Sequence, residues 1–458
     1  EKTLTRIHHS LAKPYLISGH SHTLSASTGI TLYPDDIGDI DTLLRHADQA
    51  MYQAKQQGKH RYHLFDAKHD QQVVQKHHHL DEIQQALSNN EFCLYYQPKV
   101  NMKTGSVFGA EALIRWNHPD KGLIPPLDFL PLIDGSDLEI KIGDWVTNQA
   151  LMQLEAWQKQ GINLEVSINI SSQHLLSDSF IAQLEEGLGK YSAVDSKLLQ
   201  LEILESSALG DLDSISHIIK TCQNSLGVSV ALDDFGTGYS SLTHLRSLPA
   251  NLVKIDQSFI RHILDDPNDF DITDGVIGLT ASFNREVIAE GVETTEHGLM
   301  LLMMGCEEAQ GYGIAKPMPA EDIPDWLNQY IPNQEWLLCG NKHADIKESK
   351  RKLFRLTTER WKDTFIENIL SAPESADHWP IMDKKQCPCG AWLKRAKREK
   401  LFGSEGLKRL KQAHNDVHTI ADILWSKYHA GDIVAAQEGI EDFLLAFNKM
   451  ELVLEQCE

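Results

Sequence analysis

Seven short apolar runs between residues 107 and 310 each carry one or two polar side chains near their end. Helical patterns follow these β-rich runs, so strand-like and helix-like stretches alternate. This alternation is typical of a (β/α) barrel, whose strands hold functional side chains rigidly and whose C-terminal rim collects them. The polar residues, in chain order, are Glu111, Asn169, Glu202, Asp233, Asp234, Lys254, Glu290 and Gln310.

Carboxylates, amides and a lysine that meet at one rim point to a divalent metal site. Unpaired buried charges are costly, so cations are expected between the carboxylates. Mg²⁺ and Mn²⁺ prefer oxygen ligands in nearly octahedral geometry. Hydrolysis of a phosphodiester benefits from two such ions roughly 4 Å apart. The adjacent pair Asp233 and Asp234 suits this task, because one carboxylate can bridge both ions while the other binds the second.

The chain length of 458 residues predicts several domains. We expect an N-terminal α/β segment, a helical linker, the barrel, a second linker, and a helical C-terminal domain with clustered Lys and Arg. The corresponding ranges are 1–66, 67–90, 91–331, 332–345 and 346–458.

The charge balance narrows the choice of partners. The formal net charge of −22 disfavours binding to a nucleic acid polymer or an anionic membrane. A phosphate substrate therefore needs metals or a local basic group. No apolar stretch approaches the ~18 residues of a membrane-spanning helix. Seven mostly scattered cysteines indicate a reduced, cytoplasmic protein, and a chain that begins at Glu1 is interpreted as a fragment.

The barrel segment resembles the EAL family, whose members hydrolyse cyclic di-GMP to the linear dinucleotide pGpG. The resemblance implies a TIM-like (β/α)8 barrel in which one strand runs antiparallel to the others. It also implies a homodimer formed through the barrel. The motifs that carry it are EALIRW at 111–116, INIS at 168–171, LEILES at 201–206, DDFGTGYSSL at 233–242, VKID at 253–256, AEGVET at 289–294 and QGY at 310–312.

The resemblance assigns roles to these residues. One metal ion is expected on Glu111, Asn169, Glu202 and Asp233, and the other on Asp233, Asp234 and Glu290. The remaining polar positions have catalytic or substrate roles: Lys254 contacts the nucleophilic water, Gln310 orients water or substrate, Glu205 anchors the DFGTGYSSL loop, and Leu113 and Arg115 contact the substrate. Considered alone, each of these acidic residues is also compatible with a solvated residue at the rim that has no metal-binding role.

Residues 1–66 resemble the C-terminal half of a GGDEF (diguanylate cyclase) domain. The stretch LSASTGITLYP reads as a strand, and IDTLLRHADQAMYQAKQQG reads as a helix that ends near Gly58. The half that carries the GGDEF signature loop is missing from this chain. We therefore expect a packing fragment without cyclase activity.

The C-terminal region carries a second candidate metal site. His414 and His418 are four residues apart on an expected helix, so they share one face, and Cys387 and Cys389 lie upstream in CPCGAW. This combination resembles the chemoreceptor zinc-binding (CZB) domain, a helical bundle that binds Zn²⁺ with three histidines and one cysteine. Thr358 stands where that family has its first histidine. Either Cys389 substitutes and gives a Cys₂His₂ site, or the zinc site is degraded and the helices only pack.

The prediction from the sequence is a Mg²⁺- or Mn²⁺-dependent cyclic di-GMP phosphodiesterase whose turnover is tuned by zinc at the C-terminal domain. One alternative is a receptor that binds cyclic di-GMP without cutting it and signals through that domain. Another is a scaffold that uses its C-terminal helices for partner contacts. Binding without turnover would favour the receptor, and no nucleotide binding would favour the scaffold.

Overall fold

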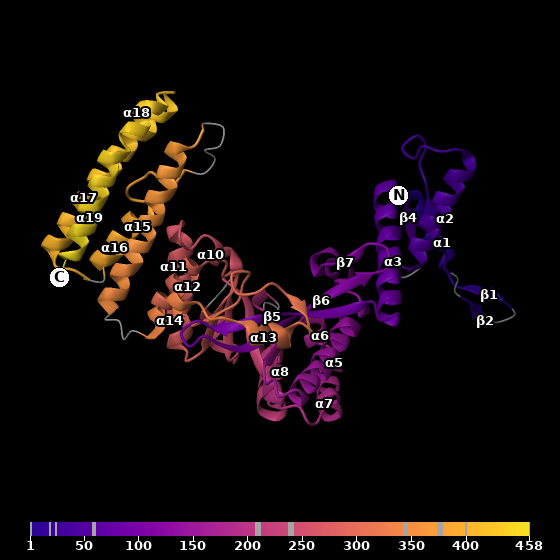
Figure 1. Cartoon of the computed structure of the whole chain (residues 1–458). Coiled ribbons are helices and arrows are strands. Elements are labelled where there is room, and N and C mark those ends of the chain that lie inside the picture. Colours follow the sequence, from indigo (N-terminus) through magenta and orange to yellow (C-terminus); the bar gives the residue numbers. More distant parts are fainter. Residues whose placement is uncertain are drawn as a thin grey trace. The chain divides into compact units, whose positions relative to one another are not determined.

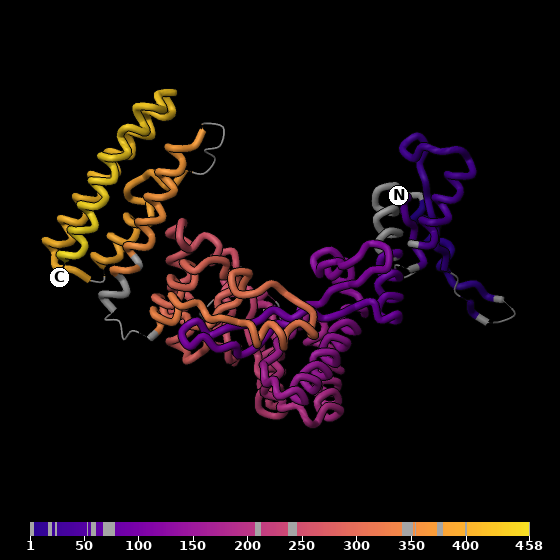
Figure 2. Tube along the Cα trace, in the orientation of Figure 1, coloured from indigo at the N-terminus to yellow at the C-terminus, as the bar shows by residue number. Residues whose placement is uncertain are grey.

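A computed structural model of the chain describes residues 2–17, 20–22, 25–56, 61–206, 212–236, 242–341, 346–372, 379–398 and 401–457. Its contacts divide the chain into two compact units, one of residues 1–91 with 118–134 and one of residues 92–117 with 135–458. The first is a small α/β unit, and the second contains the barrel and the C-terminal helices (Figure 1, Figure 2).

The first unit is built around a short parallel strand pair covered by a helix. Strands β3 and β4 pair with Thr28 opposite Tyr62, and α2 lies against β3. The helix approaches so closely that a Cβ on Gly29 would lie 1.8 Å from the carbonyl oxygen of Ala47. The elements are α1 (Lys2–Leu11), β1 (Tyr15–Ile17), β2 (His20–His22), β3 (Thr28–Ile30), α2 (Ile40–Gln56), β4 (Tyr62–Leu64), α3 (Ala67–Ser88), β7 (Gly122–Ile124), η1 (Pro126–Asp128) and α4 (Leu130–Ile133).

Eight strands of the second unit close into the predicted barrel. They follow the order β5-β13-β12-β11-β10-β9-β8-β6, and β6 pairs with β5 to complete the circle. Strand β5 is antiparallel to both of its neighbours, whereas the other neighbouring strands of the barrel pair in parallel. The strands are β5 (Phe92–Asn101), β6 (Ser106–His118), β8 (Glu165–Ile170), β9 (Leu199–Leu204), β10 (Ser229–Phe235), β11 (Leu252–Ile255), β12 (Glu286–Ala289) and β13 (Glu308–Ala309), with β14 (Met318–Pro319) beside β5. The predicted fold, including its one antiparallel strand, is confirmed.

The strands are apolar because helices cover their outer side and side chains fill the inside. All four residues of β11 are buried, as are the first five of β9. The helices are α5 (Asp137–Lys159), α6 (Ser172–Leu175), α7 (Phe180–Lys190), η2 (Ser196–Leu198), α8 (Leu212–Thr221), η4 (Cys222–Leu226), α9 (Leu242–Ser247), α10 (Gln257–Arg261), α11 (Pro267–Ser282), α12 (Thr295–Met304), α13 (Ile323–Gln329) and α14 (Gln334–Asn341).

Helix α14 occupies most of the stretch that the sequence suggested as a linker. The Trp336 indole nitrogen donates to the carbonyl oxygen of Thr295, at 2.8 Å. Its ring lies so close to Gly298 that a Cβ there would approach it to 2.3 Å. The segment therefore packs against α12.

The C-terminal region is all helical, as predicted. Its core joins Phe365, Trp361, Phe443 and Phe447, which are at most 7% exposed. The helices are α15 (Ile346–Leu370), α16 (Pro388–Arg398), α17 (Ser404–His429), α18 (Ile433–Glu438) and α19 (Ile440–Glu455). Among all helices that the structure describes, none combines the length and apolarity needed to cross a bilayer.

Candidate active site and C-terminal metal cluster

Neighbouring strands bring the polar residues of the barrel to one rim. Strand register places Asn169 opposite Glu202, and Glu111 opposite Ser167 one strand further. Glu111 lies in the middle of β6, because this strand continues beyond Ala112, its last residue paired with β8, and remains paired with β5 there. Lys254 lies on β11, while Glu290 and Gln310 directly follow β12 and β13.

A bulge lets two consecutive aspartates serve one site. Successive residues of a strand normally point to opposite faces. The register between β10 and β11 shifts between Leu232 and Phe235, and Asp234 adopts a left-handed φ of 53°. A bulge of this kind re-aims a side chain. As a result, carboxylate oxygens of Asp233, Asp234 and Glu290 all lie within 4.8 Å of one another.

Lys254 is the buried centre of the acidic group. Its side chain is 1% exposed, and its ammonium nitrogen lies 2.5 Å from Glu202, 2.6 Å from Glu290 and 3.1 Å from Asp233. Glu111 is a fourth carboxylate at 3.7 Å. Burial alone would lower the pKa of Lys254, but these carboxylates hold it well above its usual value. The lysine is therefore charged at neutral pH.

Two amides orient Glu111. Asn169 Nδ2 and Gln310 Nε2 each donate to one of its carboxylate oxygens at 2.7 Å. Gln310 also donates to Gln97 Oε1 at 3.0 Å, and Gln97 in turn donates to the carbonyl oxygen of Ala315. Burial opposes ionisation of Glu111, yet Lys254 and the two amides hold its pKa below the ordinary value. Glu111 is therefore an ionised, fixed carboxylate.

The other acids of the rim repel one another. Burial, followed by the negative charge of Glu111, raises the pKa of Glu202 to about 8. Burial also raises the pKa of Glu290 well above its usual value, despite Lys254. Burial and the charge of Asp233 raise the pKa of Asp234 to about 6. One lysine thus offsets only part of the negative charge collected here.

The arrangement fits divalent cations. Glu202 Oε1 is buried and has no hydrogen-bond partner among the residues that the structure describes. An unpaired buried carboxylate oxygen is costly, and a hard cation would satisfy it. The group formed by Asp233, Asp234 and Glu290 offers further oxygen ligands. Of the two ligand sets expected from the sequence, the structure groups Asp233, Asp234 and Glu290, and the ligands of the other ion stay a prediction.

The loop after β10 is held at its start. Glu205 is 3% exposed, and its Oε2 accepts a hydrogen bond from the backbone nitrogen of Gly236 at 3.2 Å. This hydrogen bond ties Glu205 to the start of the DFGTGYSSL loop, and its anchoring role stays a prediction. The rest of that loop, residues 237–241, lies outside the described residues.

Leu113 and Arg115 lie on β6, two and four residues beyond Glu111. Both are half-buried. The guanidinium of Arg115 lies 5.6 Å from the ring centre of Tyr95 on the neighbouring strand, and one of its nitrogens donates to the carbonyl oxygen of Ile114. Stacking on an aromatic ring holds a guanidinium in place while leaving donors available for a phosphate.

A second cluster lies in the C-terminal helices. Ligand atoms of Cys387, His414 and His418 lie within 4.8 Å of one another, and all three side chains are buried. Cys387 Sγ is 3.2 Å from His414 Nε2, while His418 Nδ1 has no hydrogen-bond partner within the described part of the chain. Cys389 is buried nearby but does not belong to this group.

The electrostatics of this cluster favour a neutral metal-free state. Burial and then the nearby His418 lower the pKa of His414 to about 3, so its imidazole is neutral and has a lone pair available. Burial raises the pKa of Cys387 to about 11. A metal ion must therefore displace the thiol proton on binding.

Three residues near the barrel site were not selected from the sequence. Gln97 lies in the run YYQPKV, where a buried amide among apolar residues was the available signal. The ring of Tyr95 on β5 lies beside Arg115 on the neighbouring strand β6. No sequence motif indicates this contact. Asp256 forms a hydrogen bond with Asp234, although it stands within the VKID motif that was recognised for its lysine.

A closed barrel with crowded acids and a buried lysine at its rim defines a class of proteins that bind divalent metals at the strand ends. Residues 80–317 match the family model described as EAL domain, which is more than half of the chain. The chain therefore belongs to the EAL domain family. Residues 1–61 match the model described as diguanylate cyclase, GGDEF domain, which agrees with the N-terminal fragment expected from the sequence.

Named relatives support this membership. The bifunctional diguanylate cyclase/cyclic di-GMP phosphodiesterase MucR of Pseudomonas aeruginosa is 38% identical over 324 residues, covering 70% of this chain and 46% of that protein. The cyclic di-GMP phosphodiesterase PdeR of Escherichia coli is 36% identical over 335 residues, covering 72% and 50%. This chain thus spans half or less of the length of these relatives.

Solved structures agree with the fold. The structure titled PaMucR Phosphodiesterase, c-di-GMP complex is 37% identical, has a TM-score of 0.52, and is matched over 54% of this chain and 99% of that chain. The EAL enzyme Bd1971 in its cAMP and cyclic-di-GMP bound form is 31% identical, with a TM-score of 0.54 and coverage of 64% and 77%.

Proposed function

We propose that this chain hydrolyses cyclic di-GMP to pGpG in its barrel, with Mg²⁺ or Mn²⁺ as the catalytic metal. The observation that carries the proposal is the buried Lys254 ammonium among Glu202, Glu290 and Asp233, beside an unpartnered oxygen of Glu202. The named relatives and the MucR complex with cyclic di-GMP support the same substrate.

The rim residues divide into metal ligands and residues that handle substrate. Glu111, Asn169, Glu202 and Asp233 are proposed for one ion, and Asp233, Asp234 and Glu290 for the other. The bound ions supply Lewis-acid chemistry at the scissile phosphodiester.

Other side chains act on the substrate directly. Lys254 keeps its proton and stabilises the negative charge that develops on the phosphate. Arg115, held on Tyr95, binds a phosphate oxygen, and Leu113 lines the same path for the substrate. Gln310 is fixed by Glu111 and Gln97, so its amide can orient water or substrate.

Glu111→Ala tests the proposal. This change removes a carboxylate that two amides and a lysine hold in place, so hydrolysis of cyclic di-GMP should fall by at least 100-fold, while the other carboxylates of the rim remain. Product analysis of both proteins with Mg²⁺ or Mn²⁺ measures this. Wild-type binding of cyclic di-GMP without any pGpG would instead identify the alternative function, a non-hydrolysing receptor.

We further propose that the C-terminal helices form a CZB-like domain that binds Zn²⁺ through Cys387, His414 and His418. Cys389 is the proposed fourth protein ligand, which would give a Cys₂His₂ site. Support comes from the grouping of three buried ligand atoms and from the unpartnered His418 Nδ1. His418 also makes a hydrogen bond to the backbone of Met382, the kind of outer contact that orients a ligand imidazole.

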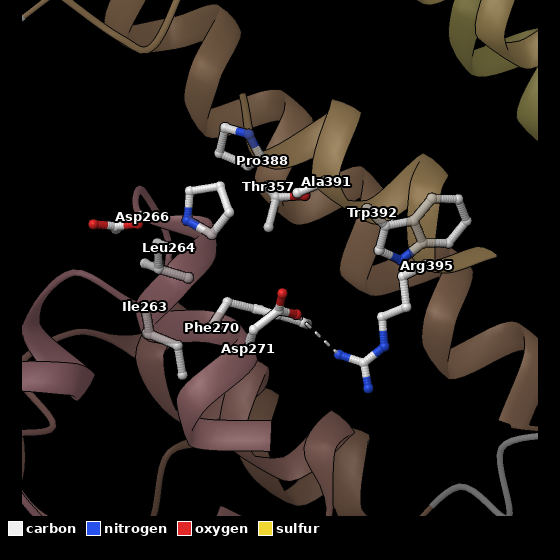
Figure 3. A pocket seen from close by; sticks show the side chains of 11 residues that line it. Ile263, Leu264, Asp266, Phe270, Asp271, Thr357, Pro388, Ala391, Trp392 and Arg395 are labelled. Carbon is white, nitrogen blue, oxygen red and sulfur yellow. Dashed lines mark ion pairs between the residues drawn. The ribbon is translucent and has the colours of Figure 1, made fainter. Parts of the chain in front are cut away.

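Helix α16 connects this site to the barrel. It starts at Pro388, directly after Cys387, and its Arg395 pairs with Asp274 and lies 3.7 Å from Asp271 on α11. Figure 3 shows a small cavity between these two helices, lined by Phe270 and Trp392 and also by Thr357 of α15. Because α11 lies between β11 and β12, which lead to Lys254 and Glu290, we propose that zinc tunes turnover through α16.

Two assignments complete the proposal. A homodimer through the barrel is supported by the family resemblance. A cytoplasmic location is supported by seven cysteines that, in the described chain, form no disulfide with one another, which fits a reducing compartment.

A further inference from the structure

The outer face of the hairpin formed by α17 and α19 carries a mixed apolar and charged stripe. On α17 the stripe consists of Asp416, Ile420, Ile423 and Lys427, which recur at steps of four, three and four residues and so share one face. On α19 it consists of Asp442, Leu445, Lys449 and Leu452. Together these residues line one shallow hollow between the two helices.

The centre of this stripe is unusually exposed for apolar side chains. Ile423 is 51% exposed, Leu445 is 71% exposed and Leu452 is 57% exposed. The inward faces of the same helices already fill the bundle core through residues such as Leu424 and Phe443. The outer apolar residues are therefore surplus to the fold of one chain, and a contiguous apolar patch rimmed by charges is typical of an interaction surface.

Two close contacts fix the register of the hairpin. A Cβ on Gly439 would lie 2.3 Å from Leu424, and one on Gly406 would lie 3.2 Å from the sulfur of Cys457. The helices are therefore antiparallel. Moving one residue toward the C-terminus of α17 corresponds to moving one residue toward the N-terminus of α19.

This register gives each end of the hollow an acid on one wall and a base on the other. Asp416 on α17 lies within about one turn of the height of Lys449 on α19. Toward the other end, Lys427 of α17 and Asp442 of α19 lie within about two turns of each other. Ile420 is at nearly the same height as Leu445, midway along the stripe.

These charges are available to a partner. Among the described residues, neither Asp442 nor Lys449 has a hydrogen bond or ion pair from its side chain, and the pairs Asp416 with Lys449 and Lys427 with Asp442 form no salt bridge within the chain. Asp416 accepts only from Gln412, and Lys427 makes one long contact of 3.5 Å to the carbonyl oxygen of Ala435.

We propose that this stripe binds the same stripe of a second copy of the chain. A two-fold axis that runs along the hollow places α17 of one copy on α19 of the other at unchanged height. Asp416 then faces Lys449 of the partner subunit, and Ile420 and Ile423 pack on Leu445 of the partner subunit. Lys427 and Asp442 of the partner subunit lie on facing helices within about two turns of each other. The result is a four-helix contact that is separate from the barrel.

The charge pattern favours a second copy over other occupants. An acidic chain with two acids on the stripe itself is poorly matched to an anionic membrane. A strongly acidic or strongly basic partner would meet like charges at two of the four positions. In a self-complementary contact the apolar centre provides most of the affinity, and the four charges set the orientation.

A charge exchange tests the pairing in the full chain. Asp416→Lys with Asp442→Lys makes all four positions basic, and Lys427→Asp with Lys449→Asp makes all four acidic. We expect each variant alone to have a dimer dissociation constant at least 10-fold higher than the wild type in sedimentation experiments. Mixing the two variants should restore association, because every facing pair is then oppositely charged. Asp422→Lys, outside the stripe on α17, is the matched control and should leave the dimer dissociation constant unchanged.

A cross-link tests the location. Chains with Ile420→Cys, mixed with chains with Leu445→Cys, should form an intermolecular disulfide under mild oxidation, and Leu370→Cys on exposed α15 should not join to either. Both stripe positions lie on the outside of the hairpin, and circular dichroism checks that the helices remain. The proposal is overturned if no such cross-link forms, or if the dissociation constant is the same for all charge variants, because any association would then occur elsewhere, as at the barrel.

Discussion

Replacing Lys254 with methionine is expected to lower kcat for cyclic di-GMP hydrolysis by about 10²–10³-fold, the range seen when one preorganised donor is removed from an active site. Among the described residues, the Lys254 ammonium is the only cationic group in contact with Glu202, Glu290 and Asp233 together. Methionine fills a similar volume without charge, so the loss is electrostatic. Single-turnover measurements at saturating Mg²⁺ separate this effect from weaker metal binding.

Lys99→Met is the matched control. Lys99 is also 1% exposed, but it pairs with Glu165 and Gln200, and Glu165 begins β8 at the end opposite to the rim. Both variants leave buried acceptors without their cation, so both should lower stability by several kcal/mol. Only Lys254→Met should lose turnover per folded molecule. Equal losses of turnover would mean that Lys254 acts through the fold and would refute its catalytic assignment.

Cys387→Ser is expected to weaken Zn²⁺ binding by more than about 100-fold, because it removes a ligand, and even outer contacts of metal sites contribute 10–100-fold. Titration against a zinc chelator of known affinity measures this directly. The zinc-dependent rise in melting temperature should disappear in parallel, since a metal that binds only the folded state stabilises it. Cys389→Ser should also weaken binding, as expected for a Cys₂His₂ site.

His429→Gln controls for histidines in general, because His429 lies on the exposed side of the same helix, α17. With Mg²⁺ held constant, zinc should change the turnover of the wild type and of His429→Gln, and should leave Cys387→Ser unaffected. Unchanged zinc affinity in Cys387→Ser would refute the site. Zinc that binds at Cys387 without altering turnover would refute only the connection through α16.

The barrel and most of its site were predictable because their signals are local. Each polar residue lies near the end of a short apolar run. Parallel strands bring the ends of these runs to one rim of the barrel, independently of the loops that connect them. This is why Asn169 and Glu202 lie opposite each other on neighbouring strands. The pair Asp233 and Asp234 was also chosen from sequence, but the bulge that lets both point into one site is visible only in the structure.

The remaining features depend on contacts between distant segments. Gln97 supports Gln310 across 213 positions of sequence, and Tyr95 meets Arg115 only because β5 runs antiparallel to β6. The charged stripe on α17 and α19 requires the register of the hairpin, which a helical pattern in either segment does not contain. The helical patterns in the sequence correctly predict a helical C-terminal bundle. They do not predict which helix faces remain exposed on its surface.

The most direct test of the central claim is removal and return of the divalent metal during turnover. Purified chain treated with EDTA and dialysed should no longer convert cyclic di-GMP to pGpG, although binding of the nucleotide can still be measured. Adding Mg²⁺ or Mn²⁺ in excess should restore pGpG formation, and Glu111→Ala under the same conditions should remain inactive. Turnover that survives metal removal, or a wild type that binds cyclic di-GMP and forms no pGpG with either metal, would contradict the account.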